Sequence, residues 1–200
     1  MLTIPNVDRK LRIDAIIKGF ILGLIMTAFS IFSFYFITAL TEKMDLIVAG
    51  PYIFSIILPI VVTVLFALNM RKKIGGFWTF RQAVTGIFMM FLISYAIVSI
   101  GRDLIFGKLI EPNMAQKTEV VMIKVRSQAL KSSGASDKEI NNQLVELRKE
   151  FDTQKKPGIM AVVQNYIINI IMLFVLAIIF AAIFKKEPPY LVKETIIIEE

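Results

Sequence analysis

The sequence predicts an all-α integral membrane protein with four transmembrane helices and a helical hairpin inserted between helices three and four. Two observations support this fold class. Hydrophobic residues make up 56% of the chain and charged residues only 20%, with a mean hydropathy of +0.68, which is more apolar surface than a soluble domain of this length can bury. The apolar residues also gather in four long runs, and residues 101–158 form the only long polar segment between them.

The composition also limits the chemistry that we expect. Cysteine and histidine are absent, which removes disulfides, thiolate nucleophiles, the commonest metal ligand and the commonest general base. The sequence holds no HExxH, P-loop or GxSxG motif, each of which marks a known catalytic or phosphate-binding arrangement. The sequence therefore predicts that the protein is not an enzyme and has no catalytic residues, no metal site and no cofactor.

The net charge of +7 could favour either nucleic acid or anionic lipid as a partner. The basic residues are not interleaved with aromatic residues in the way that suits nucleic acid. In a chain with four apolar runs, an excess of lysine and arginine indicates membrane topology and attraction to anionic lipid. We therefore predict the lipid bilayer as a partner, and no nucleic acid.

Residues 1–18 are polar and basic, with only a weak apolar side. We predict a juxtamembrane N-terminus that leads into the first span, with a helix lying in the membrane interface as the alternative. Lys18 stands at the start of the span, where a lysine can extend its charged end to the membrane surface.

Residues 19–40 form the first apolar run. At about 1.5 Å per residue the run extends about 33 Å, enough to cross a hydrocarbon core of about 30 Å. It is too long for the apolar part of a signal peptide, and no convincing cleavage site follows it. Gly19 and Gly23 form a GxxxG motif, which lets two membrane helices approach closely. We predict packing against a neighbouring helix of the same chain, with a dimer face as the alternative.

Residues 46–70 form the second apolar run, joined to the first by so short a link that the two helices should be antiparallel neighbours. Pro59 lies in the middle of this run. A proline there removes a backbone hydrogen bond and predicts a kink. We interpret the kink as a packing feature, with a role in gating as the alternative.

A basic triplet and a glycine pair, Gly75 and Gly76, separate the second run from the third. The glycine pair predicts a turn, and the aromatic residues after it are typical of the lipid headgroup region. The third run covers residues 83–106, and Arg102 and Asp103 lie near its far end. These two residues are about 100° apart on a helix. We interpret them as markers of the membrane boundary, with a functional role as the alternative.

Residues 107–158 predict an extramembrane helical hairpin. Pro112 breaks the preceding helix and Asn113 can cap the first arm. Ser136 and Glu139 have the spacing of a capping box at the start of the second arm. That arm carries an apolar stripe at helical spacing, formed by Ile140, Leu144, Leu147 and Phe151. So small an apolar face is not stable alone, so we expect the hairpin to rest on its own bundle, a second copy or a partner.

The fourth apolar run covers residues 159–184, and residues 185–200 are predicted to form a flexible tail. Asn165 and Asn169 are four positions apart and share one face of the helix. We expect them in the bundle interior, with hydrogen bonds across helices, and a substrate site is the alternative. In the short segments, most basic residues lie in the two termini and in the link between spans two and three, and four spans put these three segments on the same side of the membrane. This predicts that both termini are cytoplasmic and that the hairpin is extracytoplasmic.

Three features together resemble a known family. They are the Lys18–Gly23 start of the first span, the Gly75–Phe80 turn, and a Glu111–Pro112 break followed by the Ala135–Ile140 turn. In their order and spacing they resemble a family of bacterial four-helix membrane proteins catalogued as a domain of unknown function, DUF4199, over roughly residues 15–185. The resemblance implies a bacterial inner-membrane protein that crosses the membrane several times, and it supplies no catalytic residues.

Two functional hypotheses follow from the sequence. The first is a non-enzymatic inner-membrane protein whose extracytoplasmic hairpin contacts an envelope protein partner or a second copy in a homo-oligomer. The alternative is a small oligomeric transporter or channel in which Pro59, Asn165 and Asn169 line a path.

Overall fold

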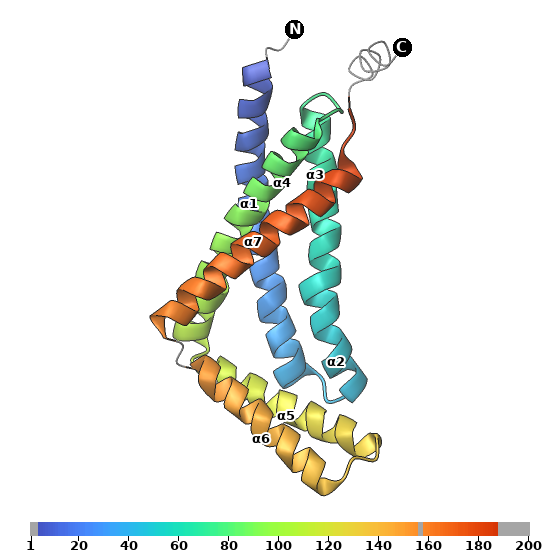
Figure 1. The fold of residues 1–200 in the computed structure, drawn as a ribbon, viewed down its shortest axis with the longest axis vertical. Coiled ribbons are helices and arrows are strands. Elements are labelled where there is room, and N and C mark those ends of the chain that lie inside the picture. Colours follow the sequence, from blue (N-terminus) through green and yellow to red (C-terminus); the bar gives the residue numbers. More distant parts are fainter. Residues whose placement is uncertain (1–3, 156–157, 188–200) are drawn as a thin grey trace. The chain divides into compact units, whose positions relative to one another are not determined.

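The computed structural model describes residues 4–155 and 158–187. In these two ranges the backbone is helical, with no β-strand and one isolated β-bridge between Trp78 and Lys186 (Figure 1). The α-helices are α1 (Ile4–Tyr35), α2 (Met44–Tyr52), α3 (Leu58–Lys73), α4 (Phe80–Val98), α5 (Met114–Ser132), α6 (Asp137–Lys155) and α7 (Ile159–Phe184). Three π-helical segments continue or interrupt them: η1 (Phe36–Leu40), η2 (Ile53–Ile57) and η3 (Ser99–Ile110).

Four stretches of the described chain are helical, long and apolar enough to cross a membrane: Val7–Leu40, Met44–Lys73, Phe80–Ile110 and Ile159–Phe184. The prediction of an all-α fold with four membrane-spanning helices is confirmed. The first three stretches extend beyond the predicted apolar runs. A helix can continue through polar residues at its ends, because its backbone hydrogen bonds do not require apolar side chains. Hydropathy alone therefore underestimates the length of the helix.

From Ile4 onward the N-terminal segment belongs to the first helix, because α1 runs without a break from that residue. Leu11 and Ala15 on this part of α1 are buried. Leu11 packs beside Gly86 of α4, where an added Cβ would lie 3.0 Å from the Leu11 Cδ1 atom. The predicted juxtamembrane segment is therefore the beginning of α1, and one side of it is part of the packed core.

The chain forms two compact units. Unit 1 is built from Met1–Met26, Pro59–Val98 and Ile167–Glu200, and unit 2 from Thr27–Leu58 and Ser99–Tyr166. Unit 1 therefore holds the first part of α1, nearly all of α3, the whole of α4 and most of α7. Unit 2 holds the end of α1, α2, the three π-helices, α5, α6 and the start of α7.

The core of unit 1 combines small and large apolar side chains from α1, α3, α4 and α7. Two aromatic pairs join α4 to α7 edge-on, Phe88 with Phe174 at 5.3 Å and Phe91 with Phe180 at 5.8 Å between ring centroids. Small residues on α7 let it approach the core closely. The buried members are Leu11, Ala15, Leu22, Ala67, Met70, Trp78, Ala83, Ile87, Met90, Phe91, Ala177 and Ala181.

Unit 2 is organised around aromatic rings and wide helical turns. Phe106 of η3 is buried and contacts Phe34 and Tyr35 of α1 at 5.6 and 5.7 Å between ring centroids. Phe54 of η2 contacts Phe36 of η1 at 5.5 Å. All three π-helical segments lie in this unit, and π-helical turns occur in proteins mainly as local departures from an α-helix.

Helices α5 and α6 lie side by side in unit 2, and α5 also contacts η1 and α2 (Figure 1). Ile140 is the one buried side chain on these two helices within the described residues. The predicted capping box is confirmed, since the Ser136 N–H donates to Glu139 Oε2 at 3.0 Å and the Glu139 N–H donates to Ser136 Oγ at 3.4 Å. The predicted side-chain cap by Asn113 is wrong, because that side chain makes no cap hydrogen bond.

The predicted tail lies mostly outside the described residues, which end at Glu187. Its first residues are hydrogen-bonded within unit 1. The Lys185 N–H donates to the carbonyl of Ala181 at 2.8 Å, and the Lys186 carbonyl accepts from the N–H of Trp78 at 2.9 Å. The prediction of a flexible tail for residues 188–200 falls on residues that the structure does not describe.

Candidate functional site

The turn between α3 and α4 begins with the glycine pair that the sequence singled out. Gly75 has φ of +108° and Gly76 has φ of +84°, a left-handed conformation that glycine adopts without steric strain. The Gly76 N–H donates to the carbonyl of Arg71 at 2.9 Å, which closes the end of α3. A Cβ on either glycine would meet nothing within 4 Å. The pair is therefore needed for its backbone conformation and not for close packing.

The indole of Trp78 joins this turn to the end of α7. Its Nε1–H donates to the carbonyl of Phe184 at 2.8 Å, and Arg71 donates to the same oxygen at 3.1 Å. Trp78 is only 1% exposed, so its ring is packed inside the protein, between the α3–α4 turn and the end of α7. Its neighbours Phe77 and Phe80 are exposed. The carbonyls at a helix end lack partners within the helix. Trp78 and Arg71 both donate to one of these carbonyls, that of Phe184.

The carboxylate of Asp14 on α1 binds two lysines. Lys18 lies one helical turn further along α1 and donates to one carboxylate oxygen. Lys73 at the end of α3 donates to the other at 2.6 Å. Lys18 is only 6% exposed, so Asp14 compensates its charge in place of water. The two ion pairs of Asp14 therefore connect α1 to α3.

A second polar contact at this end of unit 1 involves the start of α4. The Thr79 N–H donates to Gln82 Oε1 at 3.1 Å, and the Gln82 N–H donates to Thr79 Oγ1 at 3.3 Å. This reciprocal arrangement is a capping box. The Gln82 amide then donates to Asp8 of α1 at 3.1 Å. The contact fixes the start of α4 against the first part of α1.

The GxxxG motif faces α4. A Cβ on Gly19 would lie 2.6 Å from the carbonyl oxygen of Met90, and a Cβ on Gly23 would lie 2.6 Å from Cβ of Ile97. The two glycines therefore bring the backbones of α1 and α4 close together. The motif therefore packs against a neighbouring helix of the same chain, as predicted, and not in the way that the alternative of a dimer face requires. In unit 2, Gly101 of η3 approaches Thr27 of α1 in the same manner.

Pro59 is buried near the start of α3. The π-helical segment η2 ends two residues before it, and the Leu58 N–H donates to the carbonyl of Ile53, five positions back. Pro59 has no N–H to continue the α-helical pattern. The local response to the missing donor is therefore a wide π-helical turn.

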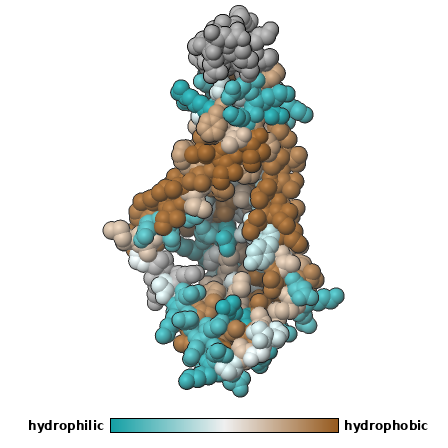
Figure 2. Space-filling model, turned by 45° about the vertical axis from the view of Figure 1, so that its right-hand side comes forward, coloured by the Kyte–Doolittle hydropathy of each residue, from teal (hydrophilic) through white to brown (hydrophobic). Residues whose placement is uncertain are grey.

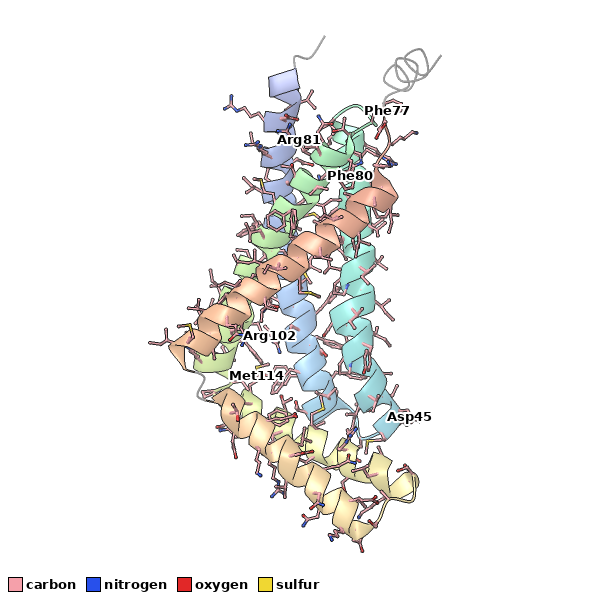
Figure 3. All side chains as sticks on the ribbon, in the orientation of Figure 1. Asp45, Phe77, Phe80, Arg81, Arg102 and Met114 are labelled. Carbon is pink, nitrogen blue, oxygen red and sulfur yellow. The ribbon has the colours of Figure 1, made fainter. Side chains whose placement is uncertain are left out.

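The remaining residues singled out by the sequence occupy exposed positions. Arg102 and Asp103 are exposed on η3 in unit 2 (Figure 3 labels Arg102). Asn165 and Asn169 are also exposed, so the expectation that they lie in the bundle interior is wrong. Helix α7 presents its small residues, Ala177 and Ala181, to the core, and the asparagines lie outside that buried face.

Sequence reasoning missed the polar residues that do gather at one end of unit 1. The pairing of Asp14 with Lys18 could have been predicted from the sequence, since opposite charges four positions apart share one helix face. The contacts of Asp14 with Lys73 and of Trp78 with Phe184 could not have been predicted in this way, because they join residues distant in the sequence. In residues 4–155 and 158–187, no group of three or more Asp or Glu side chains has an arrangement that could hold a metal ion.

These features define a helical membrane protein that crosses the bilayer several times, with a packed four-helix core in unit 1 and an aromatic-rich unit 2. The chain belongs to the family described as protein of unknown function, DUF4199, which it matches over residues 18–186. The family resemblance is thereby confirmed, and it brings no activity with it. Neither the curated proteins nor the solved structures gave a match.

Proposed function

We propose that this protein is a non-enzymatic membrane protein whose α5–α6 helix pair binds another protein in the cell envelope, either a partner or a second copy. The observation that carries the proposal is the exposed apolar surface of this pair. Val120 is 66% exposed on α5 and Val145 is 43% exposed on α6, while Ile140 alone is buried among the described side chains of both helices. A helix pair with so small a core gains stability by burying such side chains against another surface.

The attachment of the pair also supports the proposal. Helix α5 contacts η1 and α2, which lie at the end of the first candidate span and the start of the second. The Asn113–Ser136 region is thus joined to the spans by packing as well as by the chain itself. A binding element held in this way loses little conformational freedom when a partner binds.

The proposed setting is a bacterial inner membrane with both termini in the cytoplasm and α5–α6 on the opposite side. The short basic segments that support this orientation include Arg71–Lys73 between the second and third spans. Ser133, in the turn after α5, provides the test. A Ser133→Cys variant should react with an impermeant thiol reagent from the periplasmic side of intact cells. Labelling only after permeabilisation would show that the orientation is inverted.

Crosslinking in native membranes tests the binding proposal itself. Val120→Asp combined with Val145→Asp should remove the specific crosslinked product, because both changes place a charge on the exposed apolar surface. The matched control combines Gln128→Asp with Asn142→Asp, which are exposed on the same two helices and already polar. Loss of the product in both double variants, or in neither, would contradict the proposal. The product's mass and composition distinguish a second copy from a different protein.

The transporter alternative predicts flux of solute in liposomes that contain the purified protein. Pro59 is buried within unit 1, whereas Asn165 and Asn169 are exposed on α7. A path lined by the two asparagines would therefore have to form between copies of the chain. Flux that persists in the Val120→Asp and Val145→Asp variant would favour transport over protein binding.

A further inference from the structure

Among the described residues, one end of unit 1 carries several cations with no acidic partner. Arg9, Lys10 and Arg12 on α1, Lys72 on α3 and Arg81 on α4 are all exposed. No carboxylate in residues 4–155 and 158–187 forms an ion pair with any of them. We call these five residues the basic rim. They belong to segments that the Asp8–Gln82 and Asp14–Lys73 contacts hold together at the same end of the unit.

The acids described at this end of unit 1 have partners of their own. Asp14 is bound by Lys18 and Lys73, and Asp8 accepts a hydrogen bond from the Gln82 amide. Glu187 lies 3.9 Å from Lys185. The positive charge of the basic rim is therefore available to an external anion, and it is concentrated at the ends of three candidate spans.

The basic rim has an apolar border. Phe77 and Phe80 are exposed on the turn between α3 and α4, and Figure 3 labels both beside Arg81. The Lys186 ammonium lies 5.2 Å from the centre of the Phe77 ring. Figure 2 shows hydrophilic side chains at this end directly next to the hydrophobic flanks of the helices. Among the exposed apolar residues on those flanks are Ile13 and Ile17 of α1 and Ile183 of α7.

We propose that the basic rim binds the phosphate group of an anionic membrane phospholipid. The guanidinium and ammonium groups meet the phosphodiester, and the aromatic rings and neighbouring isoleucines contact the glycerol and the first part of the acyl chains. A free phosphate ion would meet the same cations but would leave the apolar border without a partner. The combination of charge and apolar surface therefore selects a lipid as the source of the phosphate.

The test uses the full-length protein in detergent, titrated with phosphatidylglycerol and followed by native mass spectrometry. The Lys72→Gln and Arg81→Gln double variant should bind this lipid more weakly by about 25-fold, since each cation near a membrane surface contributes about fivefold. The matched control is Lys138→Gln with Lys149→Gln, two exposed lysines of α6, and it should bind like the unchanged protein. Fluorescence of Trp78, the only tryptophan, verifies that each variant is folded.

Two further arms identify the ligand. Phosphatidylcholine, whose headgroup has no net charge, should bind at least tenfold more weakly than phosphatidylglycerol. Inorganic phosphate at millimolar concentration should not displace the bound lipid. Equal weakening in the test and control variants, equal binding of the two lipids, or displacement by inorganic phosphate would each overturn the proposal.

Discussion

The indole N–H of Trp78 donates a hydrogen bond to the carbonyl oxygen of Phe184 across 2.8 Å and 106 positions of sequence. Arg71 donates to the same oxygen, and the backbone of Trp78 is bridged to that of Lys186. The last turn of α7 is therefore attached to the turn between α3 and α4. Three of the four spans meet at this contact, which makes it a sensitive point in the packing of unit 1.

Replacing Trp78 tests how much this contact contributes. Trp78→Ala should lower the free energy of unfolding by about 3–5 kcal/mol, because it removes a fully buried side chain and leaves a cavity. Trp78→Phe should cost less, because a ring still fills much of the space and Arg71 still donates to the Phe184 carbonyl. Denaturant titration in micelles, followed by far-UV circular dichroism, measures both. Phe77→Ala, at an exposed neighbour, serves as the control.

Asp14→Asn should destabilise unit 1 by about 3 kcal/mol, because it leaves the buried Lys18 ammonium without a compensating charge. Adding Lys18→Met should recover most of the loss, since the buried charge is then gone as well. Lys73→Gln should cost no more than about 1 kcal/mol, because that lysine is exposed. A double-mutant cycle of unfolding midpoints checks this. Additive effects of Asp14→Asn and Lys18→Met would show that the two residues are not coupled.

Gly23→Ala should destabilise the α1–α4 contact by about 1–3 kcal/mol, because the new methyl group overlaps Ile97 and the helices must separate. Gly158→Ala is the matched control, since a Cβ there meets nothing within 4 Å. The loss of thermal stability of the purified protein measures the difference. If Gly23→Ala is as stable as Gly158→Ala, the close approach of α1 and α4 is incorrect.

Gly76→Val should cost about 1–2 kcal/mol, because a side chain on Cβ is strained at positive φ. Gly76→Asn should cost clearly less, since asparagine tolerates the left-handed region better than other residues. The space around the glycine does not enter the comparison, because it is open. Unfolding midpoints of the two variants test this ranking, and the reverse order would exclude backbone strain as the cause.

The start of α6 should lose protection in acid. Hydrogen bonds from the Ser136 N–H and hydroxyl lower the pKa of the Glu139 carboxyl from its usual 4.5. A carboxyl with a lowered pKa in the folded state contributes stability above its unfolded pKa, and this contribution disappears as the pH falls through the folded pKa. Hydrogen-exchange protection of the Asp137–Ile140 amides should therefore fall below about pH 4.5.

Glu139→Gln should remove most of that pH dependence, because the amide does not titrate. Glu146→Gln, on an exposed position of the same helix, should leave it unchanged. Protection that falls equally in both variants would assign the acid effect to another group.

Features encoded by neighbouring residues were predictable. The capping box of Ser136 and Glu139 needs only two residues three positions apart, and hydrogen bonds at that spacing confirm it. The four spans needed only the length and hydropathy of their runs. The failures involve burial. Asn165 and Asn169 were expected in the interior but are exposed, and no neighbouring residue in the sequence indicated that Trp78 would be buried.

The sequence by itself determined that this chain is a helical membrane protein, where its spans lie, and which turns need glycine, because each depends on local backbone preferences and on the hydrophobicity of continuous segments. Only the tertiary structure decided that Asp14 pairs with Lys73, that Gly23 faces Ile97 and that Trp78 binds the end of α7. Each of these helices has apolar residues on several faces, so hydropathy did not decide which face packs into the core. Close packing and the pairing of buried polar groups then selected one of them.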